Sequence, residues 1–382
     1  MGYRRFAGAV LAGIALLLGL HGVVGGGQSA PSDVAPESDD RGYSLRELAG
    51  WDSGEFDHQL FKSKAGNKEL LKSASQDGSI TVGTWNWEWF HSSAKRGFPE
   101  LPASRKFPPR TDADLKVLAS EIEKLGLSLV LLQEIQGVDI EGDYGENGAY
   151  GPVMDRLLKQ FASPTWDYAM GSSGGSQRLA MLYRRDTLHM NSFVELDDKD
   201  EVFERTPIFA HFTIIDADST YNDFTAVDVH LKSGQHKTAI HDLQMGTLRA
   251  AIDVFREKGQ GMPKGENDII IGGDLNANRF DKKQEAFWDI YETAGLDILA
   301  DDDSTYSATR MSGKDDYGLH ESKIDYLIVS SWKGGLLGNE VAQTTGQVHT
   351  ELLERYSPLR YRERLSDHLA VTVTIKVVQD DD

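Results

Sequence analysis

Apolar runs that alternate with helical patterns constrain the fold of this chain most strongly. Several of the runs are nearly continuous in Val, Ile and Leu, as expected for strands that are covered on both faces. Turn-forming residues or helical segments separate them. The runs occupy residues 80–87, 127–134, 178–185, 207–215, 223–231, 268–276, 323–331 and 368–375.

Helical periodicity fills several of the intervals between these runs. The first helical segment begins with Thr111 or Asp112 as a suitable N-cap and ends at Gly126, a suitable C-cap. Alternation of strands and helices, with some strands directly adjacent in sequence, predicts mixed α/β layers with helices outside the sheets. The predicted helices lie within residues 111–126, 153–162, 236–259 and 283–295.

The N-terminal part of the chain differs from the rest. Residues 1–30 combine the basic start "MGYRR", an apolar middle and a small-residue exit, which resembles an export signal. The apolar middle is short for a membrane span, so a cleaved signal is favoured over a retained anchor. We therefore expect a signal at 1–30, a polar linker at 31–77 and one folded domain at 78–378, in a secreted or periplasmic protein. A retained segment would anchor it to the membrane.

Composition narrows the function classes. The chain has no Cys, so disulfides contribute nothing and the apolar core must stabilise the fold. Its formal net charge of -20 argues against a surface that binds any polyanion non-specifically. A local basic cleft, or an enzyme that uses bound cations, remains compatible with this charge.

Polar residues cluster at the ends of the predicted strands. A layered fold can bring strand ends together at one edge, so this many acids, amides and imidazoles in equivalent positions suggest one shared site. A polar residue at one strand end alone would be explained by exposure of that end to solvent. The residues are Asn86, Glu134, His230, Asp274, Asn276, Asp325, Asp367 and His368.

These residue types point to one kind of chemistry. They supply hard oxygen ligands and imidazoles without a thiol, a set that favours Mg²⁺, or alternatively Mn²⁺ or Ca²⁺. A cation held by Glu134, with Asn86 and Asp367 nearby, could neutralise phosphate charge. His368 with a carboxylate partner could accept a proton from attacking water. The sequence therefore predicts phosphoester hydrolysis without a covalent intermediate.

The motifs "TWNW", "LLQE", "DVHLKSG", "GGDLNA", "KIDYLIVS" and "LSDH" occur in that order between residues 80 and 376. In this order and spacing the chain resembles the endonuclease/exonuclease/phosphatase superfamily, which includes deoxyribonuclease I. The resemblance implies a four-layered α/β sandwich, in which two mixed β-sheets are flanked by helices. It also implies a site at one end of the sheets.

The resemblance implies a role for each motif residue. Glu134 is similar to the main metal carboxylate of the family, assisted by Asn86 and Asp367. His368 resembles the general base or the histidine that polarises the phosphate, and Asp325 resembles the carboxylate that orients it.

Three further positions follow from the resemblance. Asp274 resembles the acid near the attacking water, and it stays open whether Asp274 or His368 takes the proton. Asn276 resembles an amide that holds a phosphate oxygen. His230 resembles a phosphate ligand or proton donor, but Gln177 stands where deoxyribonuclease I pairs this histidine with a glutamate. A neutral amide cannot raise the histidine pKa by charge pairing, which weakens the general-acid role.

Three functions remain in competition. Arg205 and Lys232 lie near the motifs and suit phosphate binding, which favours an exported nuclease with a nucleic acid substrate. The alternative is a sphingomyelinase-like enzyme acting on phospholipid, or a hydrolase of small phosphoesters. A sphingomyelinase-like enzyme would have its membrane-docking hairpin in the segment 330–339, which contains Trp332. An inactive binding module is disfavoured because the polar set is complete. We infer no protein partner and expect a monomer.

Overall fold

The computed structural model describes the folded domain with several internal gaps. Residues 1–78, with the predicted signal and linker, lie outside the described residues, as do most of 283–295 and most of the hairpin around Trp332. No helix within the described ranges is long and apolar enough to span a membrane. The described residues are 79–91, 109–137, 151–175, 177–198, 200–215, 223–234, 238–259, 262–278, 288–289, 295–299, 309–310, 322–331, 335 and 346–376.

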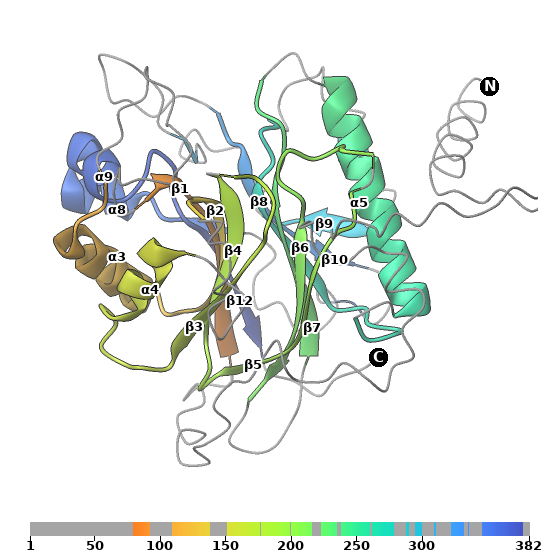
Figure 1. Ribbon diagram of the computed structural model, residues 1–382, viewed down its shortest axis with the longest axis horizontal. Coiled ribbons are helices and arrows are strands. Elements are labelled where there is room, and N and C mark those ends of the chain that lie inside the picture. Colours follow the sequence, from red (N-terminus) through yellow and green to blue (C-terminus); the bar gives the residue numbers. More distant parts are fainter. Residues whose placement is uncertain are drawn as a thin grey trace, which may run out of the picture.

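Two six-stranded sheets form the centre of the molecule (Figure 1). Each sheet is mixed, since the pairs β1/β2 and β7/β8 are parallel and the other paired strands are antiparallel. The first sheet has the order β11 (Gln347–Val348), β12 (Val371–Lys376), β1 (Ser79–Phe90), β2 (Leu127–Ile135), β4 (Arg178–Arg184) and β3 (Trp166–Met170). The second has the order β5 (Leu188–Glu195), β6 (Ile208–Ile214), β7 (Asp223–His230), β8 (Ile269–Asp274), β10 (Asp325–Ser330) and β9 (Leu296–Ile298).

Helices cover the outer face of each sheet, which confirms the predicted four layers (Figure 1). The second sheet is covered by α5 (Thr238–Lys258). The first is covered by α3 (Asp112–Lys124), α4 (Pro152–Leu158), α8 (Glu351–Tyr356) and α9 (Pro358–Arg364). Helix α3 begins with a capping box between Thr111 and Asp114, and Gly126 follows its end at a φ of +66°. Left-handed backbone of this kind favours glycine at a helix end.

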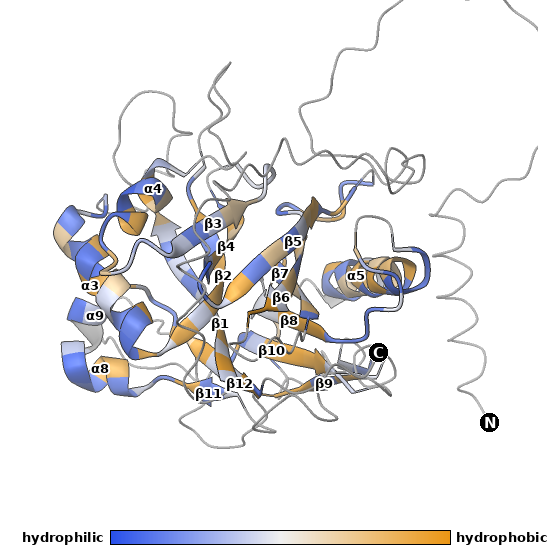
Figure 2. Cartoon of the chain, turned by 90° about the horizontal axis from the view of Figure 1, so that it is seen from below, coloured by the Kyte–Doolittle hydropathy of each residue, from blue (hydrophilic) through white to orange (hydrophobic). Residues whose placement is uncertain are grey.

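Apolar side chains from both sheets meet in the middle of the sandwich. Leu129 and Leu131 of the first sheet pack in one cluster with Ile270 and Leu327 of the second. The strands are mostly hydrophobic, whereas the helices have hydrophilic outer faces (Figure 2). The sheets approach closely at Gly272, where an added Cβ would lie 2.6 Å from Leu131 Cδ1. A larger residue there would force the Leu131 and Leu327 side chains to shift.

A polar bridge crosses this apolar interface. Gln133 Nε2 of β2 donates to Asp228 Oδ1 of β7 at 2.6 Å and to Thr84 Oγ1 of β1 at 3.1 Å. Asp228 is fully buried, and burial raises the pKa of its carboxyl well above the ordinary value. Gln133 immediately precedes Glu134, and Asp228 lies two residues before His230. The bridge thus fixes the two sheets relative to each other directly beside the polar strand ends.

All eight predicted apolar runs are strands, but four further strands were not predicted. β5 has a mixed pattern of exposed and buried residues because it is an edge strand of its sheet. β3 is short and carries polar and aromatic residues, and β9 and β11 are only three and two residues long. Such segments lack the length from which periodicity can be recognised. The same holds for α8 and α9 before the "LSDH" motif.

Candidate active site

The predicted polar residues come together between the two sheets at one end of the sandwich. Asn86 lies at the centre of this group. Its side-chain Nδ2 lies 3.3 Å from Glu134 Oε1 and 3.1 Å from Asp274 Oδ2. One amide therefore connects β1 and the end of β2 in the first sheet with the end of β8 in the second. The sequence placed Asn86 at a strand end, whereas β1 continues to Phe90.

An irregular end of the β1/β2 pair positions Glu134. The register of the two strands shifts between Asn86 and Phe90. Glu88, Trp89 and Glu134 have φ values of +41°, +50° and +63°, which are uncommon for residues other than glycine. The backbone N–H of Trp89 donates to Glu134 Oε2 at 2.9 Å. This local strain is retained because it holds the Glu134 carboxylate at the sheet end.

Asp325 orients His368. Both carboxylate oxygens of Asp325 lie close to His368 Nδ1, at 2.9 and 3.1 Å. The other ring nitrogen, Nε2, lies 3.6 Å from Asp367 Oδ1 and 3.9 Å from Asp274 Oδ2. Burial alone would lower the pKa of His368, but the negative charges of Asp325, Asp367 and Asp274 outweigh it and raise the pKa to about 10. Nε2 is thus a donor directed at the carboxylate cluster.

The position of "SDH" before an apolar strand follows from its hydrogen bonds. Ser366 Oγ donates to the Asn86 carbonyl at 2.5 Å and accepts from the His368 N–H at 2.9 Å. The His368 carbonyl accepts from Trp85 Nε1 at 3.0 Å and from the Tyr361 hydroxyl at 2.7 Å. These bonds satisfy the buried polar groups and fix the backbone that carries the histidine.

Asp274 lies between the two histidines. Its Oδ1 accepts from the Asn276 backbone N–H at 2.9 Å, and its Oδ2 lies 3.5 Å from His230 Nε2. Burial and the neighbouring charge of Asp325 raise the pKa of Asp274 to about 7, although His368 acts in the opposite direction. A carboxyl with such a pKa exchanges protons readily near neutral pH.

His230 differs from His368 in its surroundings. Burial and the positive charges of Arg205, His368 and Arg310 lower the pKa of His230 well below its ordinary value. Its Nδ1 is buried and makes no hydrogen bond in the structure. Gln177 Oε1 instead accepts from Arg205 Nη1 at 3.0 Å. His230 is therefore neutral. This agrees with the sequence, which has the uncharged Gln177 at the position where a carboxylate would raise the pKa of the histidine.

The remaining predicted residues occupy the edge of the site. Asn276 has a φ of +48° and donates from Nδ2 to the Leu231 carbonyl at 3.0 Å. Arg205 also donates from Nε to the His230 carbonyl at 3.3 Å. Lys232 forms an ion pair with Glu204, so its ammonium group is engaged away from the carboxylate cluster.

Three charged residues that the sequence did not single out complete the site. Arg310 Nε lies 3.6 Å from Asp367 Oδ2, and Arg362 Nη2 lies 4.0 Å from the same oxygen. Arg362 also donates to Glu88 Oε1 at 2.7 Å. Burial, followed by the charge of Asp367, raises the pKa of Glu88 to about 7 despite Arg362. Neither Glu88 nor Arg310 had a sequence signal that could have found it. Glu88 follows Asn86 by two residues, but its positive φ breaks the strand alternation on which such a prediction would depend.

The donor set fits a hard divalent cation. Asp274, Asp325 and His368 each present one possible ligand atom within 4.8 Å of the others. Because Asp325 engages Nδ1 of His368 and Nε2 is a donor, the ligands of this end are carboxylate oxygens. Asp367 Oδ1 is buried without a hydrogen bond, and the half-buried Glu134 carboxylate lies 3.3 Å from Asn86 Nδ2. Several carboxylates this close repel one another unless a cation lies among them. In the structure the side chains of Arg310 and Arg362 supply part of that positive charge.

Comparison with known proteins decides the family. The model of the "Endonuclease/Exonuclease/phosphatase family" matches residues 83–368. The chain belongs to the endonuclease/exonuclease/phosphatase family. Enzymes of this family are phosphoester hydrolases that typically depend on a divalent metal, and the acidic and histidine groups of this chain are of the kind that binds one. No curated protein matched the chain in the comparison made.

Solved structures of the endonuclease/exonuclease/phosphatase family share the fold at low sequence identity. A family member from Bacteroides vulgatus is 15% identical with a TM-score of 0.50, and the match covers 78% of this chain and 99% of that chain. TDP2 from D. rerio, in complex with a single strand DNA product, is 14% identical with a TM-score of 0.51. That match covers 78% of this chain and 100% of the other.

Proposed function

We propose that this protein is an exported, divalent-metal-dependent phosphodiesterase that hydrolyses nucleic acid. The observation that carries the proposal is the convergence of Glu134, Asn86, Asp274, Asp325 and His368 at one end of the two sheets. Asn86 shows this convergence most directly, because its Nδ2 contacts the Glu134 carboxylate of the first sheet and the Asp274 carboxylate of the second. Family membership supports the reaction class.

Cation binding is assigned to Glu134, Asn86 and Asp367. We favour Mg²⁺, with Mn²⁺ or Ca²⁺ as alternatives, because the donors are oxygens. A bound divalent ion would neutralise phosphate charge and lower the pKa of attacking water. Asn86 is suited to place the Glu134 and Asp274 carboxylates for this purpose, since its Nδ2 reaches both.

Proton movement is assigned to Asp274 and His368. Asp325 engages Nδ1 of His368, so Nε2–H is the group left to donate to a non-bridging phosphate oxygen. Asp274 Oδ2 lies next to His368 Nε2, His230 Nε2 and Asn86 Nδ2, and it is the acceptor for the proton of the attacking water. His230 is neutral and positions the phosphate through Nε2. Asn276 and Arg205 bind phosphate oxygens at the edge of the site.

A polyanionic substrate is favoured by the cations around the carboxylates. Arg205, Arg310 and Arg362 surround the site although the chain as a whole is acidic. Arginine side chains in this position suit the phosphates that flank a scissile phosphodiester. Nucleic acid has such flanking phosphates, whereas a small phosphomonoester has none. Lys232, released from Glu204, would add a further phosphate contact.

Export is proposed from the first thirty residues, which carry a basic start and an apolar segment. The test is expression of the full chain in a bacterial host followed by cell fractionation and N-terminal mass analysis of the protein. Secretion predicts a shortened chain in the periplasm or medium. A full-length chain in the cytoplasm would contradict it.

The activity test uses the purified chain with four substrate classes: single- and double-stranded DNA, RNA, sphingomyelin and an inositol phosphate. Each is incubated with Mg²⁺, Mn²⁺, Ca²⁺ or a chelator. We expect metal-dependent cleavage of DNA or RNA and loss of that cleavage in the Asp274→Asn variant. Product formed from sphingomyelin alone would replace the nuclease proposal with a phospholipase-type function, and absence of any product would favour a binding module.

A further inference from the structure

A second group of ligating side chains lies at the other end of the sandwich. His211 belongs to β6, Asp223 is the first residue of β7, and Glu266 lies in the loop before β8. The candidate active site uses the last residues of β7 and β8, His230 and Asp274. A strand of six to eight residues separates the two groups, which corresponds to about 20 Å.

We propose that His211, Asp223 and Glu266 form a separate divalent-cation site that prefers an ion of the zinc class. One ligand atom from each residue lies within 4.8 Å of the others. His211 Nε2 lies 3.0 Å from Asp223 Oδ2, and His211 Nδ1 lies 3.2 Å from Glu266 Oε2. The proposed ligands are His211 Nδ1 and the Glu266 carboxylate, with Asp223 holding the imidazole through Nε2.

The unsatisfied nitrogen of His211 carries this assignment. The His211 side chain is only 2% exposed, and its Nδ1 makes no hydrogen bond although Glu266 Oε2 is 3.2 Å away. Two ligands with bond lengths typical of zinc, held at a tetrahedral angle, lie about 3.3 Å apart. The observed separation therefore suits two atoms bound to one ion. Hydrogen bonding of Nε2 to Asp223 fixes the tautomer that leaves Nδ1 as a ligand.

Thr225 offers a further oxygen beside these ligands. It is the direct cross-strand neighbour of His211 in the β6/β7 pair, so both side chains lie on the same face of the sheet. Thr225 Oγ1 is also buried without a hydrogen-bond partner. Two unsatisfied polar atoms on neighbouring buried residues are uncommon in a native structure unless an ion or water binds them.

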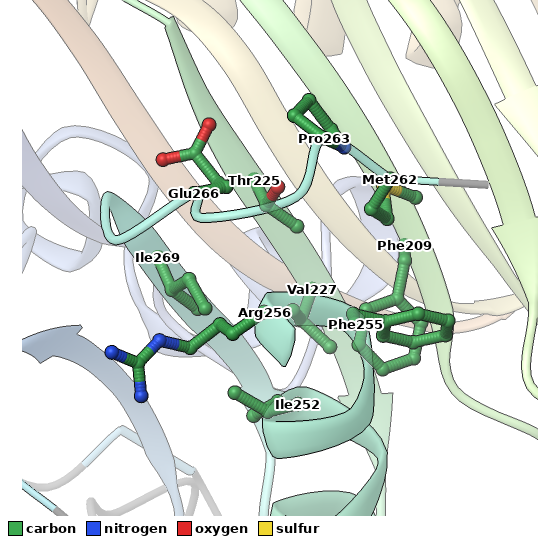
Figure 3. Close-up of a pocket in the computed structure, with 10 residues that line it drawn as sticks. All are labelled: Phe209, Thr225, Val227, Ile252, Phe255, Arg256, Met262, Pro263, Glu266 and Ile269. Atoms are coloured by element: carbon green, nitrogen blue, oxygen red, sulfur yellow. The ribbon is translucent and has the colours of Figure 1, made fainter. Parts of the chain in front are cut away.

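A small cavity adjoins the group and limits what can bind. Thr225 and Glu266 line it together with apolar side chains that include Val227, Ile252 and Phe255 (Figure 3). Its volume of about 10 Å³ corresponds to roughly one water molecule. An organic ligand does not fit in this space, whereas one ion-sized or water-sized particle does.

The loop that carries Glu266 is held in place before any ion binds. Glu266 Oε1 accepts from the Asp268 backbone N–H at 2.7 Å, and the Asp268 carbonyl accepts from the Thr225 backbone N–H at 2.7 Å. Imidazole together with carboxylate ligands favours zinc and related transition metals over Mg²⁺. The site is thus pre-organised for a cation that differs from the one proposed at the catalytic end.

The test measures zinc retained by the full-length chain. The parent variant is Glu134→Gln, which weakens cation binding at the candidate active site. It is treated with chelator, loaded with Zn²⁺, desalted and analysed for zinc by mass spectrometry. The same procedure is applied after adding Glu266→Gln, His211→Gln or Asp253→Asn. Asp253 is an exposed carboxylate on α5 that pairs with Arg249 and serves as the matched control.

We expect about one zinc ion per chain in the parent and in the Asp253→Asn control, and at least a ~10-fold lower content with Glu266→Gln or His211→Gln. Loading with Co²⁺ should give the visible absorption of a four-coordinate ion in the parent only. Circular dichroism confirms that each variant is folded. The proposal is overturned if the parent retains no zinc, or if a folded Glu266→Gln chain retains as much as the control.

Discussion

Two buried histidines, His368 and His211, lie at opposite ends of the same sandwich, and each is flanked by carboxylates. His368 has one nitrogen engaged by Asp325 and the other directed toward Asp274 and Asp367 without a hydrogen bond. His211 has a carboxylate close to each nitrogen. The residue types are the same, so the difference in expected function arises from their surroundings.

The surroundings differ in positive charge and in access. Arg310 and Arg362 lie beside Asp367 in the candidate active site, and Arg310 is partly exposed. The His211 group instead adjoins a small, mostly apolar cavity that Arg256 also lines and that has room for about one water. The two clusters therefore differ in the space available beside them and in the number of arginines close to their carboxylates. The predictions below test this distinction.

The largest effect is expected from His368→Ala. Loss of the group that donates to the phosphate should lower kcat by at least ~10² with the fold intact. His189→Ala, which removes an exposed histidine on β5, should leave kcat unchanged. Initial rates at saturating substrate and metal provide the measurement. Equal rates for both variants would remove His368 from the scheme.

Metal dependence should change in the Glu134→Gln variant. Replacement of the principal ligand by a neutral amide should raise the metal concentration needed for half-maximal activity by about 10- to 100-fold. Titration of Mg²⁺ and Mn²⁺ against the initial rate gives this value. An unchanged midpoint would place the cation elsewhere, and Glu351→Gln, at a half-exposed carboxylate on α8, is the control.

A smaller effect is expected from Arg310→Ala. Loss of a phosphate contact should raise KM for nucleic acid by roughly 10-fold with a lesser change in kcat, and Arg310→Lys should restore part of the loss. Steady-state kinetics at several salt concentrations separate the two parameters. An unchanged KM would mean that the Arg310 side chain does not contact the substrate.

The smallest effect concerns stability without metal. Burial lowers the pKa of His211, but the two flanking carboxylates of Asp223 and Glu266 outweigh it and raise the pKa from 6.5 to about 9. Because the folded pKa is raised, the stabilisation is complete below pH 6.5 and is lost as pH rises through about 9. Arg256 of α5 lines the adjacent cavity and is the nearby cation.

For chelator-treated protein we therefore expect the free energy of unfolding to fall by roughly 1 kcal/mol between these pH values, since Asp223 is partly exposed and its charge is screened. Urea titrations at several pH values measure this change. His211→Gln should remove it. A pH profile that is the same with and without His211 would refute the charge pairing.

The residues of the candidate active site could be located from the sequence because they stand at one end or the other of long apolar runs. Asn86, Glu134, Asp274 and Asp325 all lie at the ends of runs whose periodicity is unambiguous, and parallel or antiparallel pairing then brings them together. Glu88 could not be predicted in the same way. Its positive φ breaks the alternation that otherwise places side chains on a face.

Other residues left no pattern to recognise. Arg310 lies in a polar stretch without strand or helix periodicity, and only tertiary packing brings it to Asp367. The group of His211, Asp223 and Glu266 comes from three separate segments with no characteristic spacing. Such sites depend on strand order and register, which a single sequence does not specify.

The division of the candidate active site between two sheets has a functional consequence. Asn86 and Glu134 come from one half of the sandwich, Asp274 and Asp325 from the other, and the buried Gln133–Asp228 contact joins the halves nearby. The proposed hydrolysis would therefore depend on the relative position of the two halves. A slight separation of the halves would be expected to abolish it while every strand and helix remained intact.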